Sequence, residues 1–593
     1  MEHLIVVVVG IVLIVIVTAL GKRLNVASPL VLVAIGLLLA LMPFVPKLGT
    51  IDPDWILVGV LPPLLYSSAI NLPAIEFRRD FTPIAGLSVL LVVLSAVVLG
   101  LFFSWAIPGL SLPLGIALGA ILSPTDAVAT SIVKRMGISP RVVTLLEGES
   151  LLNDATALVL LRTATAAIAA GFSVGTAVGA FLWGVVIAVV IGAAVGWANL
   201  RLRTWIANSA ANTALSFVIP FIAYVPTEEL GGSGLVAAVV AGLVTGQGAA
   251  RWFTPEQRLS EQVNWRTVEL ILEGGVFLVM GLELSDVVGK NLQEHDGLWH
   301  GTWLALSALA IIVGVRAVYV AFLIWRQGAR AHRYSRMDLD HIGSRLDALE
   351  RGEDPPQTQP VRIRPARARR RTPSLPADPE RRERRLSGIR RRVARMSADL
   401  DYYRGSPLGW KHGVVIVWAG MRGVVTLAAA QTLSTDTEHR PLLVFIAFVL
   451  ATVSLLVQGF TLVPLVRLLG IRDPDAGETG DDDQAEQLQD ELRAAASAAL
   501  RDPGLRRRDG TAFDPGLVRR AGERFVEPPD EAATASAQEF LRLRLALIEA
   551  QRRRLVEVTA SGRYRTSLLR RTLAELDADQ ISLELKIAGG ADE

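Results

Sequence analysis

The sequence has 593 residues, of which 51% are hydrophobic and 20% are charged, and its formal net charge is +3. In soluble proteins about a quarter of the residues are charged, so this chain is too apolar for that class and we expect much of its surface to face lipid. It contains no cysteine, which excludes disulfides, thiolate nucleophiles and zinc-thiolate sites.

Apolar stretches long enough for membrane helices recur along the chain. A bilayer core about 30 Å thick needs about 20 apolar residues in a helix, because lipid offers the backbone no hydrogen-bonding partner. Glu2 and His3, rather than basic residues, precede the first stretch, so we expect a retained helix and not a signal peptide. About thirteen spans are predicted, near 4–20, 28–45, 55–70, 81–106, 112–133, 143–165, 173–199, 208–225, 233–249, 267–284, 298–325, 407–432 and 441–468.

The charges between these spans alternate. Basic residues follow the odd-numbered spans, as Lys134, Arg135 and Arg141 follow span five, whereas the loops after the even-numbered spans hold little positive charge and some acid, as in Glu228 and Glu229. Lys and Arg are enriched in cytoplasmic loops. We therefore expect a multi-pass protein with its N-terminus outside and its C-terminus in the cytoplasm.

Two hydrophilic regions stand apart from the spans. Residues 329–405 include an arginine-rich run at 362–371, several prolines and almost no aromatic residues, which predicts a disordered cytoplasmic loop more than a tract that contacts RNA or anionic lipid. This loop divides the membrane domain into 1–328 and 406–470. Residues 471–593 open with an acidic patch and continue with helical periodicity, which predicts a cytoplasmic helical tail for dimerisation or regulation.

Three acids lie inside apolar spans, where a charge costs several kcal/mol and is a functional candidate by default. Asp126 follows Pro124 and Thr125 in span five, and Glu149 and Asp154 lie in span six. Pro124 should break its helix and free backbone carbonyls beside Thr125 and Asp126. Irregular, oxygen-rich backbone at membrane depth suits a hard cation. For each acid taken singly, a structural bridge between helices is the alternative.

The two carboxylates of span six point in different directions. At 100° per residue, Ser150 and Asp154 share one face of the helix, whereas Glu149 shares another face with Asn153 and points about 140° away from Asp154. We expect a hydroxyl and a carboxylate on one face, and on the other a carboxylate that needs a cationic partner within the protein.

Span twelve offers a counterpart to the broken span five. It contains Gly420-Met421-Arg422-Gly423, an interrupted segment with a buried charge of the opposite sign. If spans one to six and eight to thirteen form inverted repeats, spans five and twelve correspond and meet at a transport site. We predict an all-α polytopic fold of two inverted six-helix repeats with crossed broken helices; close helix packing at the glycines is the alternative.

Together these sequence segments resemble those of the cation/proton antiporters of the sodium/proton exchanger type. The matching segments are 123–129, 146–155, 281–284 and 420–423, and the resemblance covers roughly residues 1–470 outside the basic loop. It implies a homodimeric transporter of the bacterial inner membrane that exchanges Na⁺, or otherwise K⁺ or Li⁺, for H⁺ by alternating access and serves pH homeostasis. It implies no enzymatic activity, no cofactor and no nucleic-acid partner.

The resemblance also implies roles for particular residues. Asp154 would bind proton and cation in turn, and Ser150 and the backbone of Thr125 would be further ligands of the transported ion. An Asn-Asp pair in span six, here Asn153 and Asp154, tends to accompany electroneutral exchange in this family. The residues that would brace the crossing or neutralise the ends of the broken helices are Asp126, Asn153, Glu149 paired with Arg316, and Arg422.

One position departs from the family pattern. Many relatives have a Glu after the Pro-Pro-Leu-Leu-Tyr segment of span three, whereas here Ser67 and Ser68 follow Tyr66. These serines are expected to line the site without adding a carboxylate. The missing carboxylate bears on cation selectivity and affinity and not on the exchange mechanism.

Two other classes of membrane protein fit part of the pattern. A cation channel would line a pore with the same acids, but the sequence has no repeated selectivity filter, and electrical recording would distinguish the two classes. A membrane sensor would signal through residues 471–593, whose deletion an antiporter should survive with some exchange. An ATP-driven pump is disfavoured because no Walker-type glycine-rich loop is present.

Overall fold

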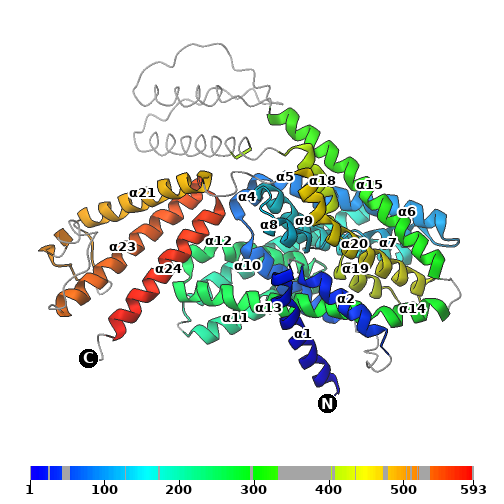
Figure 1. Ribbon diagram of the computed structural model, residues 1–593, viewed down its shortest axis with the longest axis horizontal. Helices are drawn as coiled ribbons and strands as arrows, with labels where there is room; N and C mark the ends of the chain where they lie inside the picture. The colour runs from blue at the N-terminus through cyan, green and yellow to red at the C-terminus, as the bar shows by residue number, and fades with distance from the viewer. Residues whose placement is uncertain are drawn as a thin grey trace, which may run out of the picture. The chain divides into compact units, whose positions relative to one another are not determined.

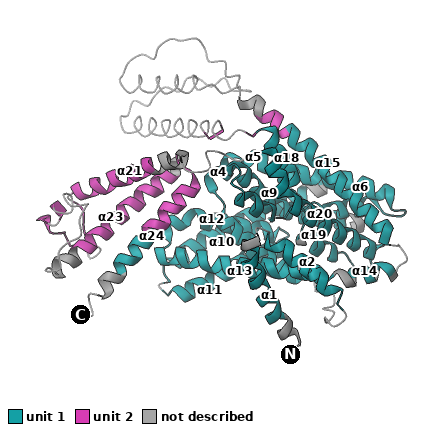
Figure 2. Cartoon of the chain, in the orientation of Figure 1, with its two compact units in different colours: residues 1–322, 409–481, 577–585 teal, residues 323–408, 482–576, 586–593 magenta. Residues whose placement is uncertain are grey.

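The computed structural model describes residues 2–24, 27–42, 54–126, 128–170, 174–206, 208–293, 298–331, 402–403, 408–434, 436–471, 479–502, 504–507, 511–516, 518–519 and 534–589. Within these ranges the secondary structure is helical, apart from one isolated bridge between Arg506 and Ala512. The chain divides into two compact units (Figure 2). Unit 1 comprises 1–322, 409–481 and 577–585, and unit 2 comprises 323–408, 482–576 and 586–593.

Unit 1 holds the apolar helices, which Figure 1 labels along the chain. The predicted break in span five is present, because two short helices, α7 and α8, replace one long one. Span twelve is divided in the same way, into α18 and α19. The elements are α1 (Glu2–Leu24), α2 (Ser28–Ala40), η1 (Trp55–Val60), α3 (Leu61–Asn71), α4 (Ala74–Arg79), α5 (Phe81–Ala85), η2 (Gly86–Leu90), α6 (Leu91–Ala106), α7 (Leu112–Ile121), α8 (Val128–Arg135), α9 (Pro140–Ala170), α10 (Val174–Arg203), α11 (Ser209–Glu229), α12 (Gly234–Trp252), α13 (Pro255–Leu282), α14 (Leu284–Gln293), α15 (Leu298–Ala331), α18 (Trp410–Trp418), α19 (Val424–Gln431) and α20 (Arg440–Leu469).

Six helices in the described part of the chain are long and apolar enough to cross a membrane, at Phe81–Ala106, Gly179–Arg203, Ser209–Glu229, Gly234–Trp252, Leu298–Gln327 and Arg440–Leu469. The helices outside this set include the ones that carry the predicted site. α9 and α13 contain several charged residues, and the broken spans consist of helices too short to cross a bilayer alone. Membrane helices therefore lie where the sequence predicts them, while the total of thirteen and the inverted repeats stay predictions.

Close helix contacts build the scaffold around α12. A Cβ atom at Gly192 would lie 2.5 Å from the carbonyl oxygen of Ala237, so α10 and α12 approach to a distance that only glycine allows. A buried ion pair, Arg203 Nη1 to Glu261 Oε1 at 2.7 Å, joins α10 to α13. Arg203 follows predicted span seven as a basic residue, and this ion pair gives it a structural role.

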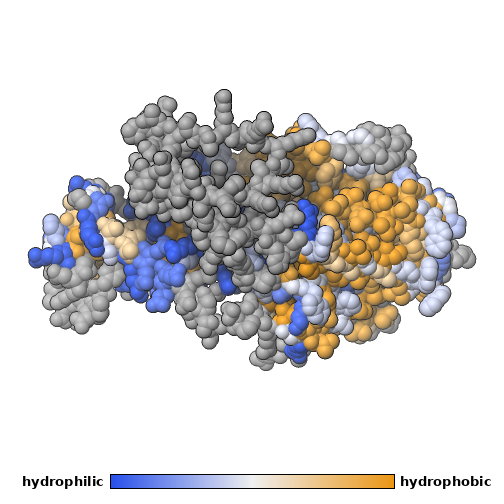
Figure 3. Space-filling model, turned by 90° about the horizontal axis from the view of Figure 1, so that it is seen from above, coloured by the Kyte–Doolittle hydropathy of each residue, from blue (hydrophilic) through white to orange (hydrophobic). Residues whose placement is uncertain are grey.

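A broad hydrophobic surface covers the end of unit 1 where Figure 1 draws α6 and α15 (Figure 3). The exposed hydrophobic side chains of these two helices include Leu101 and Trp105 of α6 and Val318 and Phe322 of α15. A contiguous apolar surface of this extent is unfavourable in water and natural in lipid. It is the surface expected of a membrane domain.

Unit 2 is built largely from helices of the C-terminal region, α21 (Thr479–Arg501), α23 (Thr534–Ser561) and the first part of α24 (Thr566–Gly589). Glu491 of α21 accepts hydrogen bonds from the Tyr564 hydroxyl at 2.9 Å and from Arg563 Nη1 at 2.7 Å. The described residues of this region are largely helical, and α21 begins at Thr479, just before the acidic run at 481–483. The predicted loop at 329–405 lies almost wholly outside the described residues.

Candidate ion-binding site

The break in span five lies against the middle of α9. α7 ends at Ile121 and α8 begins at Val128, so the backbone of Thr125 has no helical hydrogen-bonding pattern of its own. The Ser150 hydroxyl donates to the Thr125 carbonyl oxygen at 3.1 Å, and Asn153 Nδ2 donates to Thr125 Oγ1 at 2.5 Å. Two residues of α9 thereby hold the broken segment in place.

The second break meets the first. The backbone N–H of Asp126 donates to the carbonyl oxygen of Met421 at 2.8 Å, so the chain segments between α7 and α8 and between α18 and α19 are in direct contact. The Asp126 carboxylate accepts a hydrogen bond from the backbone of Val128 at 3.0 Å. Its negative charge therefore lies at the N-terminus of α8, where helix dipoles favour an anion.

Arg422 lies at the C-terminal ends of the two interrupted helices. Its Nε donates to the carbonyl oxygen of Leu122 at 3.2 Å, and its guanidinium also contacts the carbonyl oxygen of Gly420. These carbonyls follow α7 and α18, whose C-terminal ends carry partial negative charge. The Ser454 hydroxyl accepts from the Arg422 backbone N–H at 3.0 Å. That Arg422 neutralises these helix ends stays a prediction from the family resemblance.

Glu149 and Arg316 form a buried ion pair with two parallel contacts. Arg316 Nη2 lies 2.7 Å from Glu149 Oε2, Nη1 contacts Oε1, and both side chains are only 2% exposed. Arg316 Nε also donates to the Ile416 carbonyl oxygen at 3.0 Å. The pair joins α9, α15 and α18. Such an arrangement fixes geometry, because leaving either charge unpaired in this environment would cost several kcal/mol.

Asp154 has the opposite environment. Its side chain is 5% exposed, yet its Oδ1 atom receives no hydrogen bond from the described residues. The Oδ1 atom of Asn153 is likewise buried and without a hydrogen bond in this part of the chain. Buried polar oxygens are normally paired. These unsatisfied acceptors lie on the same helix as Ser150, which contacts the Thr125 carbonyl, and such oxygens can accept a proton or a desolvated cation.

The structure adds two carboxylates that the sequence reasoning missed. Glu269 and Glu273 lie one turn apart on α13, and the Ser67 hydroxyl lies 3.5 Å from Glu269 Oε2. Asp126 and Glu269 are the acids whose charges act on Glu273. The sequence does contain a signal for these residues, because two glutamates four residues apart in an otherwise apolar stretch lie on one face of a membrane helix. Ser68, by contrast, is half-buried and makes no hydrogen bond to the described residues.

Two broken helices whose breaks contact each other at Asp126 and Met421 are an arrangement typical of ion-translocating membrane proteins. The model of the family "Sodium/hydrogen exchanger, transmembrane" matches residues 10–341 and 393–468, and the chain belongs to this family.

Individual relatives and one solved structure agree with this assignment. The chain is 36% identical over 281 residues to an uncharacterized Na⁺/H⁺ exchanger of Escherichia coli, covering 45% of this chain and 50% of that protein. It is 30% identical over 308 residues to a sodium, potassium, lithium and rubidium/H⁺ antiporter of Bacillus pumilus, covering 50% and 46%. The matched regions thus span about half of each relative. The sodium proton antiporter MjNhaP1 of Methanocaldococcus jannaschii shares the fold, with a TM-score of 0.51 at 15% identity, covering 79% of this chain and all of that one.

Proposed function

We propose that this protein exchanges a monovalent cation for H⁺ across the bacterial inner membrane, and that Asp154 binds the two ions in turn. The observation that carries the proposal is the buried Asp154 carboxylate with an oxygen that no described residue satisfies. The negative charge of Asp126 acts on it, so the region is attractive to a cation. Membership in the sodium/hydrogen exchanger family supports the same activity.

A single carboxylate suffices for coupling. A bound cation disfavours protonation and a bound proton removes the charge that attracts the cation, so the two ions compete for Asp154. Alternating access then carries one ion each way, as one group of helices moves relative to another. With Asn153 neutral and Asp154 the only carboxylate required, exchange of one cation for one proton moves no net charge. We expect Na⁺ as the main cation and K⁺ or Li⁺ as alternatives, as the broad cation range in the name of the Bacillus pumilus relative suggests.

The remaining assignments follow from charge and contact. Thr125 and Ser150 would be further cation ligands. The crossing would be braced by Asn153, Asp126 and the Glu149–Arg316 pair. Arg422 would neutralise the ends of the broken helices. Lys134 and Arg135 at the end of α8 favour a cytoplasmic position for that end, which puts the N-terminus outside. We also propose a homodimer, with residues 471–593 as a cytoplasmic regulatory tail.

Everted membrane vesicles provide the direct test. Respiration acidifies the vesicle interior, and addition of Na⁺, K⁺ or Li⁺ in turn should dissipate the pH gradient in wild-type vesicles. Asp154→Asn should abolish the response to every cation, whereas Glu229→Gln, an exposed acid outside the site, should leave it intact. Cation-dependent proton movement that survives Asp154→Asn would contradict the proposal.

A cation channel is the second candidate. A cavity beside α9 is lined by Leu158 but not by Asp154, which lies one helical turn away, so this cavity alone is not a pore through the binding carboxylate. Large cation currents in planar bilayers without a proton gradient would favour the channel instead.

A further inference from the structure

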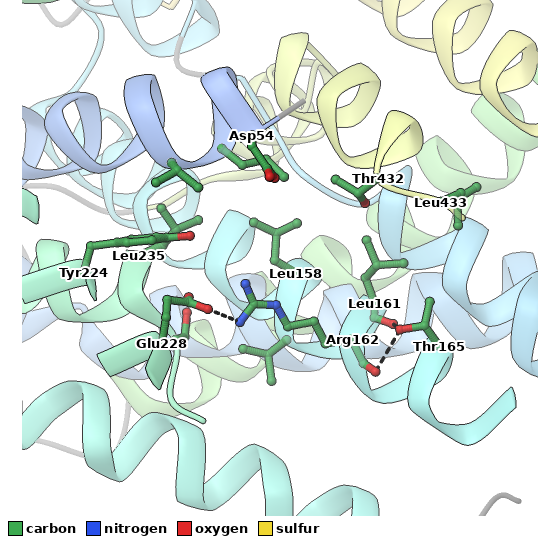
Figure 4. A pocket seen from close by; sticks show the side chains of 14 residues that line it. Asp54, Leu158, Leu161, Arg162, Thr165, Tyr224, Glu228, Leu235, Thr432 and Leu433 are labelled. Carbon is green, nitrogen blue, oxygen red and sulfur yellow. Dashed lines mark hydrogen bonds and ion pairs between the residues drawn. The ribbon is translucent and has the colours of Figure 1, made fainter. Parts of the chain in front are cut away.

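A cavity of about 290 Å³ lies over the C-terminal half of α9. This volume has room for several water molecules, because a cavity needs only about 10–15 Å³ to hold one. Figure 4 shows Leu158 between Asp54 and Arg162, with Tyr224 and Glu228 along one side. The cavity therefore combines apolar walls with a small set of charged and hydroxyl groups.

The position of the cavity relates it to the ion site. Asp154, Leu158 and Arg162 follow one another at intervals of four residues on α9, so they lie on one side of the helix. From Asp154 to Arg162 the distance along the helix axis is about 12 Å. Leu158 is the lining residue of α9 nearest to Asp154 along the helix, and Asp154 itself does not line the cavity.

The charges around the cavity favour a cation. Asp54 and Glu228 contribute two carboxylates, and Arg162 is the single basic residue among the lining side chains. The net charge of the lining is therefore negative. Low-dielectric walls strengthen the resulting field and raise the local concentration of counter-ions.

The Arg162–Glu228 ion pair is built so that one partner can move. Arg162 Nη1 lies 2.5 Å from Glu228 Oε2, and the side chains are 57% and 22% exposed. Ion pairs this accessible contribute about 0–1 kcal/mol, so opening this one costs little. Glu228 Oε1 also accepts from the backbone N–H of Gly234 at 2.8 Å, which fixes the carboxylate and leaves the long arginine side chain as the mobile partner.

We propose that this cavity is the outer vestibule of the transport route, that it attracts monovalent cations toward Asp154, and that the Arg162–Glu228 ion pair is its movable gate. The proposal rests on the proposed antiport function and on the outside position of the C-terminal end of α9. The pair joins α9, which carries the ion site, to the end of α11. A relative movement of these helices during alternating access would break and re-form it.

The absence of cysteine makes the vestibule testable, because one introduced thiol reports on one position. Leu158→Cys would probe the deep end, Thr165→Cys the rim, and Ala166→Cys, on an exposed neighbour that does not line the cavity, would be the control. Right-side-out vesicles are treated with two membrane-impermeant thiosulfonates, the cationic trimethylammonium-ethyl reagent and the anionic sulfonatoethyl reagent. Exchange is measured before and after treatment.

The expected result has three parts. The ratio of the rates with the cationic and the anionic reagent is about tenfold higher at Leu158→Cys and Thr165→Cys than at Ala166→Cys, because the lining field selects cations. Labelling of Leu158→Cys blocks exchange. Adding Arg162→Ala to Leu158→Cys raises its labelling rate, and adding Glu228→Gln lowers the preference for the cationic reagent, whereas adding Glu229→Gln does not.

Two outcomes would overturn the vestibule. One is a Leu158→Cys thiol that never reacts from outside, with Arg162→Ala making no difference. The other is a ratio of the two rates at Leu158→Cys and Thr165→Cys that equals the ratio at Ala166→Cys. If Asp154-dependent exchange persists in the same vesicles, antiport does not use this route and only the vestibule is rejected. If the cysteine-free wild type shows no exchange, the proposed function itself is rejected.

Discussion

At the scale of single residues, two acidic residues of α9, Glu149 and Asp154, are both buried but have different surroundings. Glu149 is held by Arg316 through two contacts, whereas Asp154 Oδ1 has no hydrogen bond within the described chain. The five-residue spacing already predicts different directions for these side chains. It does not predict which partner each one meets, because Arg316 lies 167 residues away from Glu149.

Glu149→Gln tests the bracing role. The substitution leaves the Arg316 guanidinium buried without a counter-charge, so we expect a loss of stability of about 3–5 kcal/mol. Thermal unfolding in detergent measures it. Glu147→Gln is the matched control, because Glu147 pairs with the exposed Lys134 and should change stability by about 0–1 kcal/mol. Equal melting temperatures for the two variants would contradict the assignment.

Glu269→Gln tests whether the carboxylate beside Ser67 assists cation binding. Removing a negative charge near the site should weaken attraction of the cation, so the apparent KM for Na⁺ should rise while the maximal rate changes little. Exchange in proteoliposomes over a range of Na⁺ concentrations gives both values. Thr267→Ala, at an exposed position of the same helix, should leave both unchanged. An unaltered KM in Glu269→Gln would exclude this role.

At the scale of elements, the two interrupted helices depend on close contact between their breaks. A Cβ atom at Gly423 would collide with the carboxylate of Asp126. Gly423→Ala should therefore displace Asp126 and strongly reduce exchange while the protein remains inserted in the membrane. Gly314→Ala in α15 is the control, since a Cβ there meets no atom within 4 Å. Normal exchange in Gly423→Ala would show that the breaks tolerate separation.

The sequence predicts some of these elements and misses others for physical reasons. Pro124 predicts the break in span five, because proline removes a helical hydrogen bond. The short helices α4 (Ala74–Arg79) and α14 (Leu284–Gln293) are not predicted, since they are too short and too polar to register as spans. The contact between Asp126 and Met421 is also beyond sequence reasoning, because no local pattern encodes a pairing across about 300 residues.

The C-terminal helices offer a test by pH. Burial of Tyr564, together with its hydrogen bond to Glu491, raises the pKa of its hydroxyl from 10.0 to about 12. The folded tail therefore favours the neutral phenol, and its stability should fall as the pH rises from about 10 through about 12. A difference titration of ultraviolet absorbance between the wild type and Tyr564→Phe isolates this tyrosine. An ionisation midpoint near pH 10 would contradict the structure.

At the scale of the whole molecule, the alternation of charge between spans, the two charged regions and the apolar stretches predict a polytopic helical protein with a hydrophilic tail. The structure has one unit of apolar helices and a second unit built largely from helices of the C-terminal region. The sequence does not show which basic residues are buried. Arg141 and Arg203 follow spans five and seven and so count toward loop orientation, yet both are buried in ion pairs, with Asp80 and Glu261. Loop charges and structural charges look the same in a sequence.

The central claim is that proton and cation compete for the single carboxylate of Asp154. Its most direct test is the apparent KM for Na⁺ in proteoliposomes at a series of pH values, equal on both sides of the membrane. Competition at one group predicts that KM rises by about tenfold for each unit that the pH falls in the acidic range, while the maximal rate at saturating Na⁺ stays constant. Asp154→Asn should show no exchange at any pH. A KM that does not change with pH, accompanied by a falling maximal rate, would contradict a shared site.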